Sequence, residues 1–254
     1  MRNYVTFLKK EWLESLRTYK LFVMLASFSI LGIMNPLIAK LTPEIIDLAM
    51  PEGMEIAVAV PTAFDSWAQF YKNTGQIGVI VTVIVFSGII SGELSRGTLI
   101  HMLTKGLSRS SVILSKYTYM VMLWSAGLGL SCLITWVYTV YLFPDGRISH
   151  LFFSVFCLWL FGVFLLALLL FAGSLMRATG GGLLLTGAGV GACMALQMIP
   201  VLQKRTPFAL VTENMGLIQN TVKPPELLCA AGITGVLTLA LAAGAVLVFR
   251  KKQL

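Results

Sequence analysis

The stretch from Leu151 to Met176 decides the fold, and it reads LFFSVFCLWLFGVFLLALLLFAGSLM. It contains no Asp, Glu, Lys or Arg. A helix that crosses the hydrocarbon core of a bilayer needs about 20 apolar residues, and a charge at its centre costs about 2.5–3.5 kcal/mol. The stretch therefore predicts a membrane-spanning helix.

Five further stretches have the same character, so the sequence predicts six membrane-spanning helices. The spans are expected at about 21–39, 73–92, 117–141, 151–176, 181–202 and 227–249. The whole chain is 57% hydrophobic and only 12% charged, whereas a soluble domain is about 25% charged. We therefore predict an all-α membrane protein in which residues 1–254 form a single transmembrane domain, a six-helix transmembrane bundle.

The lysines and arginines predict the orientation. The side that carries both termini holds 13 of the 19: five in residues 1–20, four after the second span, one after the fourth and three after the sixth. Because cytoplasmic loops are enriched in cations, we expect a plasma-membrane protein with both termini in the cytoplasm. The net charge of +8 then indicates contact with membrane lipid and not with nucleic acid, since the cations flank apolar spans and form no basic patch.

Residues 1–20 form an amphipathic leader. Apolar residues recur at helical spacing at Val5, Leu8, Trp12, Leu16 and Tyr19, with charged residues between them. One interpretation is a helix that lies in the plane of the lipid headgroups. The other is an ordinary positive flank that fixes the orientation, and the sequence leaves both open.

The segment 40–72, between the first two spans, is rich in proline. Pro43, Pro51 and Pro61 divide it, and proline inside a helix removes a hydrogen bond and clashes with the preceding turn. We therefore expect no long helix in the first half of this outer segment.

A short interfacial helix is expected after Pro61. Thr62 and Asp65 have the spacing of a capping box, and the helix would lead into the second span. The aromatic residues on one face of this helix are expected to anchor it at the membrane interface: Phe64, Trp67 and Tyr71.

A second outer element is expected between the fifth and sixth spans. Thr206 can cap a helix that has Pro207 at its first position, and Pro224 follows the apolar residues of this element. We predict one or two short interfacial helices at the outer face.

The segment from Glu93 to Lys116 carries the strongest functional pattern, and it reads ELSRGTLIHMLTKGLSRSSVILSK. Gly97 permits a turn out of the second span, and Thr98 can cap a short helix that ends at Lys105. A serine then caps the third span: Ser108, Ser110 or Ser111.

The short helix is half apolar, with Leu99, Met102 and Leu103 between the cations Arg96 and Lys105. Such a helix suits docking into the groove of a partner. A solvated connection that folds against the bundle is the alternative, and the residues alone do not decide between them.

The segment resembles the permeases of type-2 ABC transporters. In these permeases a Glu at the cytoplasmic end of the second span precedes Gly-Thr, a short coupling helix, a Ser-Arg pair and a Lys at the third span. The matching residues are Glu93, Gly97-Thr98, the Leu99–Lys105 helix, Ser108-Arg109 and Lys116. The six spans, the leader and the outer element before the last span agree with this layout over essentially the whole chain. The large outer segment departs from the shortest members and leaves the subfamily open.

The resemblance implies a membrane subunit of an exporter that is driven by a separate ATPase. Two ATPase copies would grip the cytoplasmic coupling helix at 98–105, and a second permease chain, identical or related, would complete the pathway. The apolar residues of the helix would pack into the ATPase, and the charged residues at its flanks would hold the loop by charge pairing. The implied interface consists of Glu93, Arg96, Gly97, Thr98, Leu99, Met102, Leu103, Lys105 and Arg109.

Several classes of protein are disfavoured by missing motifs. No GxxxxGK[ST] occurs, so any ATP is expected on the partner, and we expect neither an enzyme nor a cofactor in this chain. His101 and His150 stand alone, so no metal site is expected.

No acidic residue lies inside a predicted span, which argues against an ion-coupled carrier. An amphipathic, lipid-like or peptide cargo fits the apolar interior better. The alternative function is a non-transporting membrane scaffold or immunity-type protein that sequesters a peptide or lipid.

Overall fold

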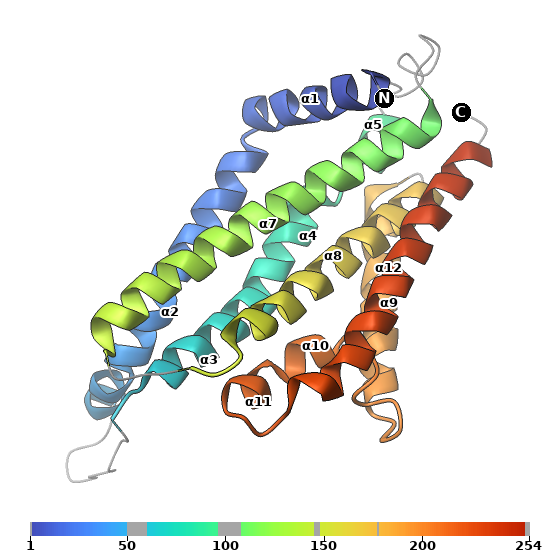
Figure 1. The fold of residues 1–254 in the computed structure, drawn as a ribbon. Coiled ribbons are helices and arrows are strands. Elements are labelled where there is room, and N and C mark those ends of the chain that lie inside the picture. Colours follow the sequence, from blue (N-terminus) through green and yellow to red (C-terminus); the bar gives the residue numbers. More distant parts are fainter. Residues whose placement is uncertain (1, 50–59, 96–107, 145–147, 177, 252–254) are drawn as a thin grey trace.

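The computed structural model describes residues 2–49, 60–95, 108–144, 148–176 and 178–251, and all regular structure in these ranges is helical (Figure 1). The elements are α1 (Arg2–Arg17), α2 (Lys20–Ala49), α3 (Ala63–Asn73), the π-helical segment η1 (Thr74–Gly78), α4 (Val79–Phe86), α5 (Ser91–Ser95), α7 (Arg109–Leu142), α8 (Leu151–Leu175), α9 (Thr179–Gln197), α10 (Ala209–Thr212), α11 (Asn214–Ile218) and α12 (Pro224–Lys251). The predicted all-α class is confirmed.

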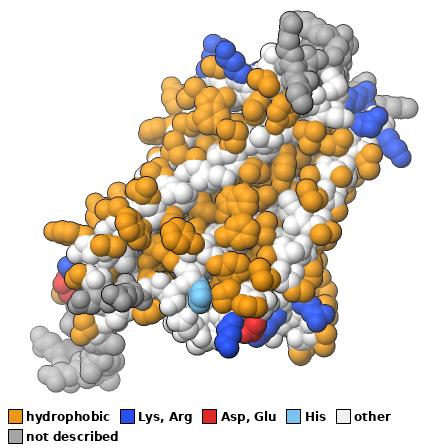
Figure 2. All heavy atoms as spheres, viewed as in Figure 1, with side chains coloured by type: hydrophobic (Ala, Val, Ile, Leu, Met, Phe, Trp, Pro, Cys, Tyr) orange, Lys and Arg blue, Asp and Glu red, His pale blue; other side chains and the backbone are white. Residues whose placement is uncertain are grey.

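Six helical segments in the described ranges are long and apolar enough to cross a membrane. They are Lys20–Ile46, Ala63–Glu93, Arg109–Leu142, Leu151–Leu175, Gly180–Gln197 and Pro224–Lys251. Large apolar side chains such as Ile80, Leu184 and Leu239 point outward, and Figure 2 shows apolar side chains over the middle of the visible face with Lys and Arg towards its ends. A surface this apolar is stable in lipid and not in water. The chain is a multi-pass membrane protein.

The spans pack as a bundle around α8. α1 begins and α12 ends at the same end of the bundle, and α10 and α11 lie at the other (Figure 1). α2 packs along α7, and α12 along α8. Of the 18 most apolar consecutive residues in each span, 67% are buried in α8 and 11% in α9. α8 is therefore the central span and α9 is peripheral.

A glycine on α8 sets the close packing of α7 and α8. A Cβ atom at Gly162 would overlap the indole ring of Trp124 on α7. The indole Nε1 of Trp124 donates to the backbone oxygen of Trp159, at 3.1 Å. Small residues permit this close approach between membrane helices.

The expectation that the first half of the segment 40–72 lacks a long helix is wrong. α2 continues through Pro36 and Pro43 to Ala49. Pro36 has no N–H for the carbonyl of Gly32, four residues earlier, but the hydroxyl of Thr135 on α7 donates to that oxygen at 3.1 Å. Neighbouring helices can satisfy a freed backbone group in this way.

The helix predicted after Pro61 forms, but it is part of the second span. Both the backbone N–H and the hydroxyl of Thr62 donate to Oδ2 of Asp65, at 2.7 and 2.8 Å, so the predicted cap is confirmed. α3 then runs without a gap into η1 and α4. Trp67 and Tyr71 are 1% and 4% exposed. They are core residues and not interfacial anchors, because α3 packs against α2 and α7.

Two short helices, α10 and α11, form between the fifth and sixth spans as predicted, but α10 begins at Ala209 after Phe208, so the cap expected at Thr206 is wrong. Their apolar side chains Leu210, Leu217 and Ile218 are buried. The fifth span ends at Gln197, and the helix of the sixth begins at Pro224.

Candidate functional site

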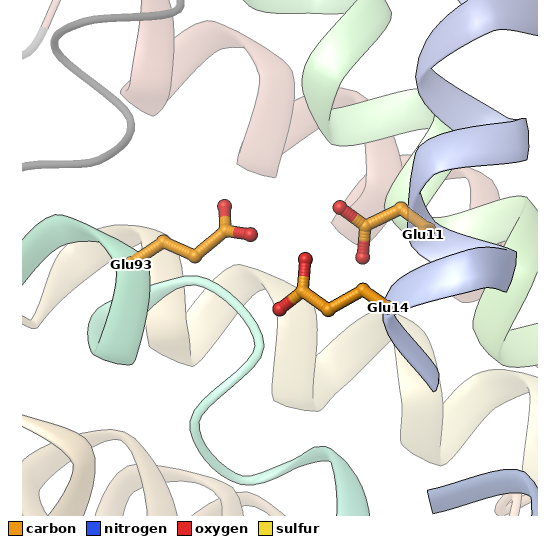
Figure 3. Close-up of side chains that lie close together, drawn as sticks. All are labelled: Glu11, Glu14 and Glu93. Atoms are coloured by element: carbon orange, nitrogen blue, oxygen red, sulfur yellow. The ribbon is translucent and has the colours of Figure 1, made fainter. Parts of the chain in front are cut away.

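Five charged side chains from three separate parts of the chain meet at the end of the bundle that carries both termini. We call them the charge cluster: Lys10, Glu11 and Glu14 on α1, Glu93 on α5 and Lys116 on α7. Figure 3 shows the three carboxylates pointing toward one another from α1 and α5. The cluster therefore joins the leader to the end of the second span and to the start of the third.

Lys116 is the buried centre of the cluster. Its Nζ lies 2.9 Å from Oε1 of Glu11 and 2.9 Å from Oε2 of Glu93. The side chains of Lys116 and Glu11 are 1% and 5% exposed. A charge buried to this degree persists only with a partner, and removing one partner of a buried pair costs about 3–5 kcal/mol.

Lys10 lies at the solvent-facing side of the cluster. Its Nζ lies 2.7 Å from Glu14, 2.7 Å from Glu93 and 3.2 Å from Glu11. Burial alone would lower the pKa of Lys10, but the carboxylates of Glu11, Glu14 and Glu93 together raise it above its ordinary value. Lys10 is therefore charged throughout the physiological pH range.

α1 packs a mixed polar and apolar face onto the bundle, and Leu8 and Trp12 contact the core. Phe7, Glu11 and Ser15 are buried and lie on one face at helical spacing. The hydroxyl of Tyr119 on α7 donates to Oγ of Ser15. The opposite side of α1 exposes apolar residues, with Val5 60% exposed. An exposed side that combines apolar residues such as Val5 with cations such as Lys9 suits a helix in the headgroup plane.

A pocket of about 310 Å³ opens beside the cluster. Its wall is formed by Glu11, Glu14, Glu93 and Lys116, and by the turn that contains Gly88. The three carboxylates offer oxygens within 4.8 Å of one another, a spacing that a metal ion could bridge. However, the ammonium groups of two lysines already lie among them, so the cluster is best described as an ion-pair network.

Two residues of the predicted partner interface lie in the described part of the chain. Glu93 has the specific partners that an acidic residue at a membrane boundary requires, and both are in this chain. The guanidinium of Arg109 donates to the backbone oxygens of Phe249 and Arg250, at 3.3 and 3.1 Å. These carbonyls end α12, where a cation is favourable. Arg109 therefore ties the start of α7 to the end of the last span.

The other seven interface residues lie outside the described ranges: Arg96, Gly97, Thr98, Leu99, Met102, Leu103 and Lys105. Their role stays a prediction. The cap after this segment is confirmed, because Ser108 precedes α7 and its Oγ accepts from the backbone N–H of Ser111 at 3.3 Å.

The sequence contained a signal for the cluster that was not used. The segments on the predicted cytoplasmic side hold three acidic residues, Glu11, Glu14 and Glu93, and all three belong to the cluster. Because the same side carries 13 lysines and arginines, these few carboxylates are expected to pair with particular cations. The pair of Lys10 and Glu14 has the i,i+4 spacing of a helix, but spacing could not select Lys10 and Lys116 as partners of Glu93, because they are far from it in sequence.

No family model matches the chain. The chain is similar to the "Uncharacterized transmembrane protein YxlG" of Bacillus subtilis (strain 168), with 24% identity over 204 residues that cover 77% of this chain and 76% of that protein. This similarity agrees with a multi-pass membrane protein. It does not identify an activity.

Proposed function

We propose that the chain is the transmembrane permease subunit of an ATP-driven ABC exporter in the plasma membrane. Two such chains, identical or related, would enclose the pathway, and two ATPase subunits would bind and hydrolyse ATP. The segment 98–105 would dock into the ATPase from the cytoplasmic side, where both termini would lie.

The charge cluster is the observation that carries this proposal. Glu93 and Lys116 flank the segment that would meet the ATPase, and they are 2.9 Å apart. Lys10 adds α1 to the same network, and Arg109 adds the end of α12. A force on the connection between α5 and α7 would therefore act on the leader and on three spans, the second, third and sixth, as transmission from an external motor requires.

The resemblance of Glu93, Gly97-Thr98, Ser108-Arg109 and Lys116 to type-2 ABC permeases supplies the second support. The chain contains no phosphate-binding loop of its own, which fits a division of labour with a partner. The apolar spans without acidic residues fit an amphipathic or lipid-like cargo.

Purification in a mild detergent tests the proposal directly. The expected result is an ATPase that co-purifies with the chain and whose hydrolysis rate changes in its presence. Leu103→Asp should abolish co-purification, because an apolar anchor in a docking groove cannot be replaced by a carboxylate. Normal co-purification with Leu103→Asp would place the interface elsewhere.

Glu93→Gln separates binding from coupling. The ATPase should still bind, but the chain should lose its effect on hydrolysis, because α5 is no longer tied to α1 and α7 by charge. Glu226→Gln is the matched control, since it removes a carboxylate from an exposed pair at the opposite end. Equal effects of the two variants would contradict a coupling role for the cluster.

A further inference from the structure

The second span is interrupted at two places. The segment η1 replaces α-helix by π-helix over Thr74–Gly78. A turn at residues 87–90 separates α4 from α5, and the N–H groups of Ser87 and Ile89 donate there to oxygens three residues earlier. A π-segment is mostly a one-residue insertion into an α-helix, and such insertions are frequent at functional sites. Eight residues of α-helix, Val79–Phe86, lie between the two interruptions.

The part of the span before η1 is fixed to its neighbours. Nδ2 of Asn73 donates to Oδ1 of Asn35 on α2 at 2.9 Å. The hydroxyls of Ser66 and Thr139 on α7 are 2.6 Å apart. Trp67 is also 1% exposed in the core. Polar bonds between membrane helices hold them in one arrangement, so α3 is a fixed outer anchor.

The part of the span after the turn is fixed as well. Glu93 on α5 is paired with Lys10 of α1 and with Lys116 of α7. α5 is therefore a fixed inner anchor, held by ion pairs instead of hydroxyl and amide bonds.

α4 is held by apolar packing where the two anchors are held by polar bonds and ion pairs. Phe86 at its inner end is fully buried, and its ring packs edge-on against Tyr119 of α7. The hydroxyl of Thr82 donates at 2.7 Å to the backbone oxygen of Gly78, within its own span, and a bond of this kind bends a helix. Its contact with Sδ of Met24 on α2 is long, at 3.9 Å. On the other side of α4, Ile80 and Ile84 are 58% and 63% exposed. The physical restraint on α4 is mainly apolar packing on one face.

α4 forms one wall of an apolar groove. The groove has a volume of about 590 Å³, and its lining includes Val83 and Ile84 of α4, Leu183 and Val190 of α9, and Phe161 of α8. Residues of η1 line the same groove. A change in the position of α4 would therefore change the width of this groove.

A glycine lets the outer joint pack closely on α2. A Cβ atom at Gly78 would lie 3.2 Å from Cζ of Phe28 on α2. The absence of a side chain at Gly78 therefore permits a close contact between η1 and α2.

We propose that α4 is a hinged segment that pivots between η1 and the turn at 87–90, and so opens and closes the groove between α4 and α9 while α3 and α5 stay in place. The proposal concerns the motion of this chain alone. Its test needs neither an ATPase nor a cargo, so its outcome is independent of the proposed transport function.

Distances between spin labels test the hinge. Labels are attached to Ile84→Cys and Leu184→Cys in the full chain in lipid nanodiscs, after replacement of the native cysteines Cys132, Cys157, Cys193 and Cys229. Lys72→Cys with Tyr141→Cys is the control pair, on the anchored helices α3 and α7. The expected distance distribution is broad or two-peaked for the first pair and narrow for the control. Equal widths would overturn the proposal.

Deleting Gln76 sharpens the test. Removing one residue from a π-segment restores α-helix without rotating the flanking helices, so the Ile84–Leu184 distribution should narrow to the width of the control pair. Gly88→Ala favours helix at the inner joint and should narrow it as well, which keeps the test decisive if the deletion variant does not fold. Gly129→Ala, on α7 where an added Cβ meets nothing within 4 Å, should leave the width unchanged. The hinge is overturned if the Ile84–Leu184 distance distribution keeps its width in Gly88→Ala and, where that protein folds, in the Gln76 deletion variant.

Discussion

Two lysine–glutamate pairs in this protein have the same chemistry but opposite surroundings. Lys116 and Glu11 are 2.9 Å apart, with side chains 1% and 5% exposed. Lys204 and Glu226 at the other end are closer, at 2.6 Å, but are 56% and 40% exposed. Water and ions screen the exposed pair, whereas the buried pair cannot lose one member without leaving a bare charge in an apolar setting. Burial, and not distance, decides which pair matters.

The largest effect is expected from Lys116→Met. This change leaves Glu11 and Glu93 without their buried cation, so the free energy of unfolding should fall by about 3–5 kcal/mol. Titration with a denaturing detergent in mixed micelles measures it. A loss below about 1 kcal/mol would mean that water reaches the site and that the contrast between the two pairs is not real.

The double variant Glu11→Met with Lys116→Met should recover most of this loss. It removes one charge of each sign, and replacing a buried pair by apolar residues of similar volume is often neutral, so stability should return to within about 1 kcal/mol of the wild type. The same titration gives the answer. If the double variant is as unstable as Lys116→Met alone, the unpaired carboxylate of Glu11 is not the main cause of the loss of stability.

Glu14→Gln is expected to have a smaller effect, of at most about 1 kcal/mol, because the carboxylate is 39% exposed. The raised pKa of Lys10 means that its stabilising contribution is complete below its ordinary value of 10.5 and is lost as the pH rises above it. The difference between wild type and variant should therefore be constant from about pH 7 to 9 and shrink above about 10.5. A difference that grows with pH would contradict the pairing with Lys10.

Glu226→Gln should have the smallest effect, with no measurable change in the unfolding midpoint. The pair with Lys204 is exposed to solvent, and such pairs contribute little. Repeating the measurement at low and high salt checks the reason. A clear destabilisation at low salt that disappears at high salt would show that this exposed pair contributes more than expected.

The sequence determined the features that depend on local composition. An apolar run such as Leu151–Met176 is stable in the lipid interior and not in water, so six such runs predicted six spans. The cap at Thr62 was also readable, because a cap depends on residues three or four positions apart. For the third span the sequence offered Ser108, Ser110 or Ser111, and the structure selects Ser108.

Tertiary structure decided what depends on contacts between distant residues. α2 passes through Pro36 because Thr135, remote in sequence, bonds the freed carbonyl of Gly32. Trp67 is a core residue because α2 and α7 cover α3. Lys10 became a partner of Glu93 only once α1 folded across the end of the bundle, and Lys116 only once α7 lay beside α5. Local spacing cannot encode these pairings, since each is formed between helices whose separation along the chain carries no information about their distance in space.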